Sequence, residues 1–120
     1  MVHVIAQLFK FRRGMYFLAV VKSLQISVRF FTILREIVGK KEEKLQFSNS
    51  QKVTVNVVLE QLGQKYGKPF KDYVYDSKNG EVKGFLQFLV NGRSISTSGG
   101  SEFKLSDEDV LAILPPVSGG

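Results

Sequence analysis

The sequence of 120 residues contains no cysteine, no tryptophan and a single histidine, His3. Without cysteine the chain can form no disulfide bond, no thiolate metal site and no thiol nucleophile. His3 lies close to a terminus, where an ordered catalytic role is not expected, and no histidine–carboxylate cluster has the spacing of a metal site. We therefore expect no metal and no cofactor bound by this chain, and the side chains of an ordinary enzyme are missing.

Long apolar runs and clustered charge are also scarce. No apolar run approaches the roughly 20 residues that a membrane-spanning helix needs, so no membrane association is expected. The formal net charge is +6, but four basic residues lie in residues 1–23, and the remainder carries 13 basic and 11 acidic residues. The lysines of that remainder are spread along the chain rather than grouped with aromatic residues. This pattern indicates a solvated surface and not a nucleic-acid partner.

The first 23 residues differ in character from the rest of the chain. The basic stretch 10–13 precedes an apolar stretch at 15–21, which imitates a signal peptide, but Lys22 stands where small residues would mark a cleavage site. We interpret residues 1–23 as an N-terminal extension of uncertain order, able to add an edge strand or to pack on the domain. Met15 is an alternative start. Residues 24–114 are expected to form one folded domain, followed by a flexible tail at 115–120.

Periodicity predicts the elements of the first half of this domain. Apolar residues alternate with polar ones over 24–30 and again around Leu45 and Phe47, which predicts two paired strands. A short helical turn is expected between them, ending at Gly39. Thr54 is the expected N-cap of the main helix, whose apolar stripe is Val55, Val58, Leu59, Leu62 and Tyr66.

Local signals also predict the end of that helix and the elements of the second half. Gly67 is expected to stop the helix and Pro69 to prevent its resumption. The segment 70–82 contains a turn signal at Asn79-Gly80, and 85–90 is typical of a central strand that ends in a tight Asn-Gly turn. Residues 110–114 are expected to form a final buried strand. This order predicts an α+β fold with one main helix packed on one face of a mixed sheet of four to five strands.

The tail after the last strand is the most informative stretch. Pro115 and Pro116 exclude helix and favour an extended path, Val117 and Ser118 are small, and Gly119-Gly120 has no Cβ atoms. The result is a narrow arm with a stiff root and a free α-carboxylate at its tip. Such an arm can enter a tunnel and present its carboxylate to another enzyme.

Several stretches together resemble one family. They are Val28-Arg29-Phe30-Phe31, Leu34-Arg35-Glu36, Thr54-Val55, Leu89-Val90-Asn91-Gly92 and the ending Ile113-Leu114-Pro115-Pro116-Val117-Ser118-Gly119-Gly120. Over residues 24–120 the chain is similar to the small subunit of molybdopterin synthase, a member of the MoaD/ThiS group of ubiquitin-like sulfur carriers. The resemblance implies the β-grasp fold.

The chain departs from the family in two places. Asp107-Glu108-Asp109 stands where members usually have Asp-Gly-Asp, and because glutamate rarely adopts a positive φ, an altered turn is expected. The stretch 70–83 is longer than in compact bacterial members, and we interpret it as a variable surface insertion.

The resemblance also implies a chemistry and a set of partners. A ubiquitin-activating-like adenylating enzyme would use ATP to adenylate the carboxylate of Gly120, which then becomes a thiocarboxylate. The tail would enter the large subunit of molybdopterin synthase and deliver sulfur to a pterin precursor, so this chain would be a non-catalytic subunit. Because these steps require ATP, a cytoplasmic location is expected. Candidate partner-binding residues are Phe30, Phe88, Leu114, Arg35 and Arg93.

Two alternatives remain open on the sequence. If a lysine of another protein attacks the activated tail, the chain is a ubiquitin-like modifier joined by an isopeptide bond. A sulfur carrier for thiamine would share the fold and the tail, although Pro115-Pro116 before the last four residues favours the molybdopterin branch.

Overall fold

The computed structural model of the chain describes residues 3–12, 15–48 and 52–116. In chain order the elements are β1 (His3–Arg12), β2 (Met15–Phe30), α1 (Thr32–Val38), β3 (Glu42–Ser48), α2 (Val55–Tyr66), α3 (Lys68–Val74), β4 (Gln87–Val90), β5 (Arg93–Ser94), a 3-10 turn (Gly100–Glu102) and β6 (Val110–Leu114). Among these residues no helix is long and apolar enough to cross a membrane.

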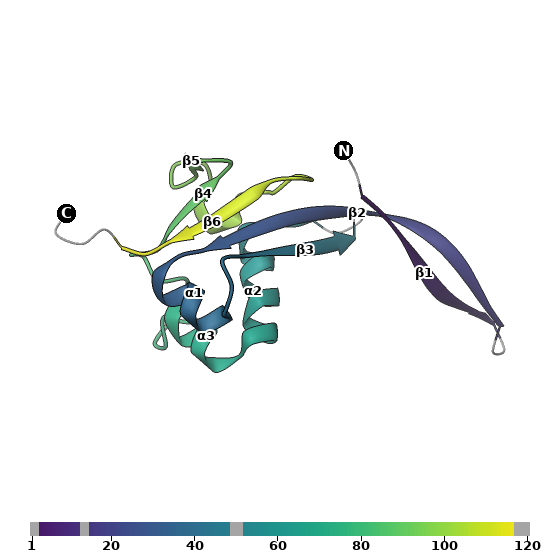
Figure 1. The fold of residues 1–120 in the computed structure, drawn as a ribbon, viewed down its shortest axis with the longest axis horizontal. Coiled ribbons are helices and arrows are strands. Elements are labelled where there is room, and N and C mark those ends of the chain that lie inside the picture. Colours follow the sequence, from purple (N-terminus) through teal and green to yellow (C-terminus); the bar gives the residue numbers. More distant parts are fainter. Residues whose placement is uncertain (1–2, 13–14, 49–51, 117–120) are drawn as a thin grey trace.

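Five strands form the sheet of the domain, in the order β3-β2-β6-β4-β5. Strands β2 and β6 run parallel, and the other neighbours are antiparallel. The helices lie on one side of strands β2 and β3 (Figure 1). The prediction of an α+β, β-grasp fold with a mixed sheet and a main helix on one face is confirmed.

Strand β1 is the sixth strand of the sheet and pairs only with β2. It pairs antiparallel with the first part of β2, from His3 opposite Ser23 to Arg12 opposite Met15, whereas β3 pairs with β2 only from Ser23 onward. The resulting two-stranded ribbon extends away from the helices (Figure 1). The boundary that the sequence placed between residues 23 and 24 therefore lies inside one continuous strand.

Helix α2 supplies one side of the core. Thr54 caps it as predicted, because its hydroxyl oxygen accepts a hydrogen bond from the Val57 N–H at 3.3 Å. Gly67, with φ of 77°, ends the helix as expected. The apolar stripe of α2 faces the inner residues of β2 and β6. The fully buried members of this core include Val55, Val58, Leu59, Leu62, Ile26, Val28, Phe30, Leu111 and Ile113.

Helix α2 does not resume after Gly67, but Pro69 does not prevent a separate helix, α3, which was not predicted. Helix α3 begins at Lys68, and Pro69 occupies its first turn. A proline is tolerated there, because the N–H groups of the first turn have no partner within the helix. The stretch after α3 folds back on itself through a bridge between Tyr75 and Val82, and the Lys83 N–H donates to the Val74 carbonyl at 2.8 Å.

Two turns depend on left-handed backbone. Asn91 and Gly92, with φ of 52° and 83°, make the tight turn predicted between β4 and β5. Glu108 has φ of 72°, and its N–H donates to the Gln25 carbonyl at 2.9 Å. Glu108 itself thus adopts a conformation that glycine favours. The turn is therefore not altered as expected. Glu108 instead keeps a left-handed backbone conformation, which costs about 1–2 kcal/mol for a residue with a Cβ atom.

Among the residues whose burial the structure describes, Glu43 is the buried acid. It lies on the helix side of β3 with its side chain 6% exposed, and it binds Lys65 Nζ at 2.5 Å, Lys40 Nζ at 3.2 Å and the hydroxyl of Tyr66. Burial raises the pKa of the Glu43 carboxyl, but the hydrogen bonds from these three groups outweigh it, so the pKa lies below its usual value. Burial and the Glu43 carboxylate raise the pKa of the Tyr66 phenol. This cluster fastens β3 to the end of α2.

We expect Glu43→Gln to lower the free energy of unfolding at pH 7 by about 1.5–3 kcal/mol, the range for hydrogen bonds to a charged group. The pKa of Glu43 is lowered in the folded state. Its contribution is therefore complete above the unfolded-state pKa of about 4.3 and is lost as the pH falls through the folded-state pKa. Urea unfolding between pH 7 and pH 3 measures this effect.

The difference between wild type and Glu43→Gln should stay constant down to about pH 5 and shrink below it. Glu42→Gln is the matched control, because Glu42 is the neighbouring acid on the exposed side of β3. A difference that does not change with pH would contradict the assignment.

Candidate functional site

The candidate site is the root of the tail, where β6 ends. Strand β6 is held by hydrogen bonds on both sides, with Ile113 opposite Phe30 of β2 and Leu114 opposite Gln87 of β4. Pro115 is half-buried and Pro116 is exposed. Because β6 is hydrogen-bonded to a strand on each side, the position and the direction in which the tail leaves the domain are fixed. Figure 1 shows that the end of β2 and the start of β4 lie beside the end of β6.

The tip of the tail lies outside the described residues. Gly120, the predicted reactive residue, and Gly119, Ser118 and Val117, predicted to thread a partner, all fall there. Their roles stay predictions. The structure places Pro115 and Pro116, the first two residues of the predicted tail, at the end of the central strand.

Phe30 and Phe88 do not form a partner surface in this structure. Phe30 has no exposed surface and Phe88 is 9% exposed. Both lie opposite Ile113 in the sheet register, so all three side chains face the helices and pack in the core. The expectation of an interface role is corrected accordingly, because the alternation of strand residues sends these two phenylalanines inward.

Leu114 lies on the opposite, outer face of the sheet. The burial of β6 alternates, with Leu111 and Ile113 buried and Leu114 half-buried. Ala112 and Leu89, which lie opposite each other, are half-buried on the same face. We call Leu89, Ala112 and Leu114 the outer apolar row. Leu89 and Ala112 were not predicted from the sequence, although β6 is apolar at every position, which is typical of a strand covered on both faces.

The two predicted arginines lie apart. Arg35 is exposed in α1, and its Nε donates to the Phe30 carbonyl at 3.4 Å, so it stands at the tail root. Arg93 is exposed in β5 and pairs with Val90, which lies opposite Leu111 at the other end of the β6 ladder. Only Arg35 is therefore placed beside the tail, and a contact of either arginine with a partner stays a prediction.

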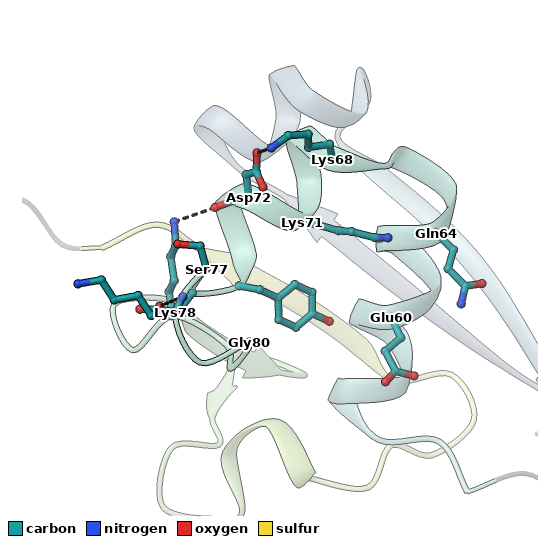
Figure 2. Close-up of a pocket in the computed structure, with 12 residues that line it drawn as sticks. Glu60, Gln64, Lys68, Lys71, Asp72, Ser77, Lys78 and Gly80 are labelled. Carbon is teal, nitrogen blue, oxygen red and sulfur yellow. Dashed lines mark hydrogen bonds and ion pairs between the residues drawn. The ribbon is translucent and has the colours of Figure 1, made fainter.

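A separate groove lies between α2, α3 and the segment after α3, with a volume of about 1000 Å³. Its lining carries charges of both signs: Lys68 pairs with Asp72 at 2.6 Å, and Lys83 donates to the Asp72 carbonyl at 2.7 Å (Figure 2). The stem of Lys71 lies across Gly63, where an added Cβ atom would come within 3.3 Å of Lys71 Cγ. Within the described ranges no group of His, Cys, Asp and Glu side chains could hold a metal. The groove belongs to the helices and not to the tail root.

Comparison with known proteins identifies the family of the chain. The model of the ThiS family matches residues 28–120. Small archaeal modifier protein 3 of Haloferax volcanii is 33% identical over 97 residues, which are 81% of this chain and 100% of the relative. The "Putative sulfur carrier protein" of Archaeoglobus fulgidus is 32% identical over 72 residues, 60% of this chain and 80% of the relative.

Solved structures agree with these relatives. Small archaeal modifier protein 1 of Methanosarcina acetivorans superimposes with a TM-score of 0.64 at 34% identity, covering 82% of this chain and 98% of that one. A chain of the BexX/CysO complex of Amycolatopsis orientalis matches with a TM-score of 0.63 at 27% identity, covering 79% and 99%. The chain therefore belongs to the ThiS family of ubiquitin-like proteins, which joins sulfur carriers and small archaeal modifiers on one β-grasp fold.

Proposed function

We propose that this chain is a sulfur carrier in molybdopterin biosynthesis, acting as the small subunit of molybdopterin synthase. The observation that carries the proposal is the central strand β6 continuing directly into Pro115-Pro116 and the sequence Val-Ser-Gly-Gly. A rigid strand fixes where the tail leaves the domain, and the two prolines keep its root extended. The residues beyond are slim enough to enter a narrow channel.

The chemistry follows from the carboxylate of Gly120. A carboxylate is a poor electrophile, because attack would add negative charge to an anionic group. An adenylating partner would join a carboxylate oxygen to the α-phosphorus of ATP with loss of pyrophosphate. A donor of sulfide-level sulfur would then attack the carbonyl carbon, the bond from that carbon to the AMP oxygen would break, and a C-terminal thiocarboxylate would remain as AMP leaves. The catalytic groups and the ATP site would belong to the partners, and this chain would supply the reacting terminus.

The relatives and the outer apolar row support this role. The Archaeoglobus relative is named as a sulfur carrier, and the Amycolatopsis neighbour was solved in a complex with a partner protein. In our proposal Leu89, Ala112 and Leu114 meet the large subunit or the adenylating enzyme, since these partly exposed apolar side chains lead directly into the tail. Because the chemistry consumes ATP, we place it in the cytoplasm.

A second function is favoured by a specific relative. Small archaeal modifier protein 3 is matched over its whole length. The activated tail could be attacked by a lysine ε-amine of another protein and not by a sulfur donor. AMP would then leave, and the product would be an isopeptide bond between Gly120 and that lysine. The same activated tail serves both routes, so they differ only in the group that attacks. The thiamine branch shares the tail as well, but neither of the two sequence relatives is named as a thiamine protein.

Mass spectrometry of the protein from its own cells separates these functions. We expect the C-terminal peptide of the intact chain to gain the mass of one oxygen-to-sulfur exchange, because the activated carboxylate is converted to a thiocarboxylate. Gly-Gly remnants on lysines of other proteins, without that mass gain, would replace the carrier by the modifier. Accumulation of the pterin precursor in cells that lack this chain would identify the molybdopterin branch.

A further inference from the structure

The ribbon of β1 and the first part of β2 projects from the domain and lies outside the part of the chain that the family model matches. That model begins at residue 28, whereas the ribbon pairs His3–Arg12 with Met15–Ser23. At about 3.3 Å for each residue of a strand, β1 is about 30 Å long. A two-stranded ribbon on its own is only marginally stable in water. A projection of this kind therefore calls for a surface that covers it.

The register of the ribbon gives it apolar residues on both faces. Residues directly opposite each other share a face, and successive residues alternate between the faces. One face, which we call the uncharged face, includes the cross-strand pairs Ile5–Val21, Gln7–Ala19 and Phe9–Phe17. The other face includes the pairs Val4–Lys22, Ala6–Val20, Leu8–Leu18 and Lys10–Tyr16. The ribbon thus has one face without lysine or arginine among these pairs, and a lysine near each end of the opposite face.

The charge of this segment has a single sign. Residues 1–23 contain four basic residues and no acidic one. Of the 18 residues at 3–12 and 15–22, 13 are apolar, and only His3 and Gln7 are polar without a formal charge. A nucleic-acid surface would need more hydrogen-bonding side chains for phosphate and sugar, and the ribbon of a second copy would bring like charges together. An anionic lipid surface offers an apolar phase and the opposite charge at once.

The open edge of the ribbon limits how deeply it can enter a membrane. Strand β1 has β2 on one side, and within the described ranges no strand pairs with its other edge. Unpaired backbone N–H and C=O groups are not tolerated in the hydrocarbon region, so the ribbon cannot span a bilayer. At the level of the headgroups, water still satisfies these groups while apolar residues meet the acyl chains and lysine stems reach the phosphates. The expectation of no membrane association depended on a missing spanning run, and a ribbon in the interface needs none.

We propose that the ribbon lies in the headgroup region of an anionic membrane, with its uncharged face toward the acyl chains. Strand β2 runs from Ser23 at the ribbon to Phe30 beside the tail root, and the end of β6 lies at the opposite end of the molecule from the ribbon (Figure 1). The contact would hold the domain at the membrane surface and leave the tail free for its partners. This inference goes beyond the sulfur-carrier function and does not depend on it.

The first test places a fluorescent reporter on the uncharged face of the full chain. Because the chain contains no tryptophan, Phe9→Trp introduces a single one. Its emission should shift to shorter wavelength with vesicles of mixed phosphatidylcholine and phosphatidylglycerol, and not with vesicles of phosphatidylcholine alone. Lipids brominated near the headgroup should quench it more than lipids brominated near the chain end, because the site is interfacial. Phe85→Trp is the matched control, an exposed ring outside the ribbon, and its emission should not change.

The second test removes the charge of the ribbon and keeps its apolar residues. Lys10→Gln combined with Lys22→Gln should weaken binding to the mixed vesicles about 25-fold, or about fivefold for each cation lost near an anionic surface. Lys44→Gln combined with Lys78→Gln makes the same charge change at exposed positions of the domain. This control should change binding by less than about twofold, because charges far from the lipid surface are screened by salt. Vesicle flotation measures both pairs, and melting temperatures show that the fold is kept.

Three results would overturn the membrane contact. The first is Phe9→Trp emission that the mixed vesicles do not change. The second is emission already shifted without lipid in a chain that sediments as a dimer, which would assign the ribbon to a second copy. The third is a shift with single-stranded RNA and not with vesicles. If Phe9→Trp does not fold, Phe17→Trp on the opposite strand gives the same measurement. None of these results bears on the thiocarboxylate, so the proposed function would stand.

Discussion

A chain shortened by Gly119 and Gly120 is expected to lose adenylation, the thiocarboxylate and lysine conjugates completely, with no change in melting temperature. All three depend on one carboxylate reaching an active site at the end of a channel. The shortened chain ends at Ser118, so its carboxylate stops about 7 Å short of the original position. The fold should not respond, because the core and the β6 ladder end before these residues.

The chemistry of the last position can be separated from the length of the tail. Gly120→Val keeps the length but adds a branched side chain beside the reacting carboxylate, and it should also abolish activation. Gln46→Val is the control, because Gln46 is exposed on β3, outside the segments that flank the tail root. ATP–pyrophosphate exchange and intact mass measure the outcome. Activation of the shortened chain at the wild-type rate would refute the tail chemistry.

The parts of this protein that could be predicted from the sequence depend on local signals. Thr54 and Gly67 delimit α2 because capping and a left-handed stop are properties of one or two residues. The Asn91-Gly92 turn is a signal of the same kind. By contrast, Pro69 was interpreted only as a barrier, although a proline is equally compatible with the first turn of a new helix.

The surface at the tail root could not be predicted from the sequence, because it depends on which strands become neighbours. The alternation in β2 is visible in the sequence, but which face meets α2 is decided by packing across the sheet. Phe30 and Phe88 were therefore assigned to the surface, whereas Leu89 and Ala112 occupy it. Leu89 and Ala112 are far apart in the chain. They become neighbours only because β6 lies between β2 and β4.

The assignment of Phe30 to the core leads to the largest expected change in stability. Phe30→Ala should lower the free energy of unfolding by about 3–5 kcal/mol, because it leaves a cavity beside Ile113, in a core where both side chains are fully buried. Whole domains of this size are stable by about 5–15 kcal/mol. Urea unfolding measures the loss, and Phe30→Leu, with a smaller cavity, gives the same information if the alanine variant does not fold.

Leu114→Ala is the matched control. Leu114 directly follows Ile113 in β6, lies on the other face of the sheet and is only half-buried. It should cost about 1 kcal/mol or less in stability, because a partly exposed side chain leaves no closed cavity. It should instead weaken binding of the partner that takes the tail. The reverse pattern, with Phe30→Ala stable but impaired in partner binding, would return Phe30 to the interface. Opposite effects from two neighbouring sites would show that one face of the sheet holds the domain together while the other meets its partner.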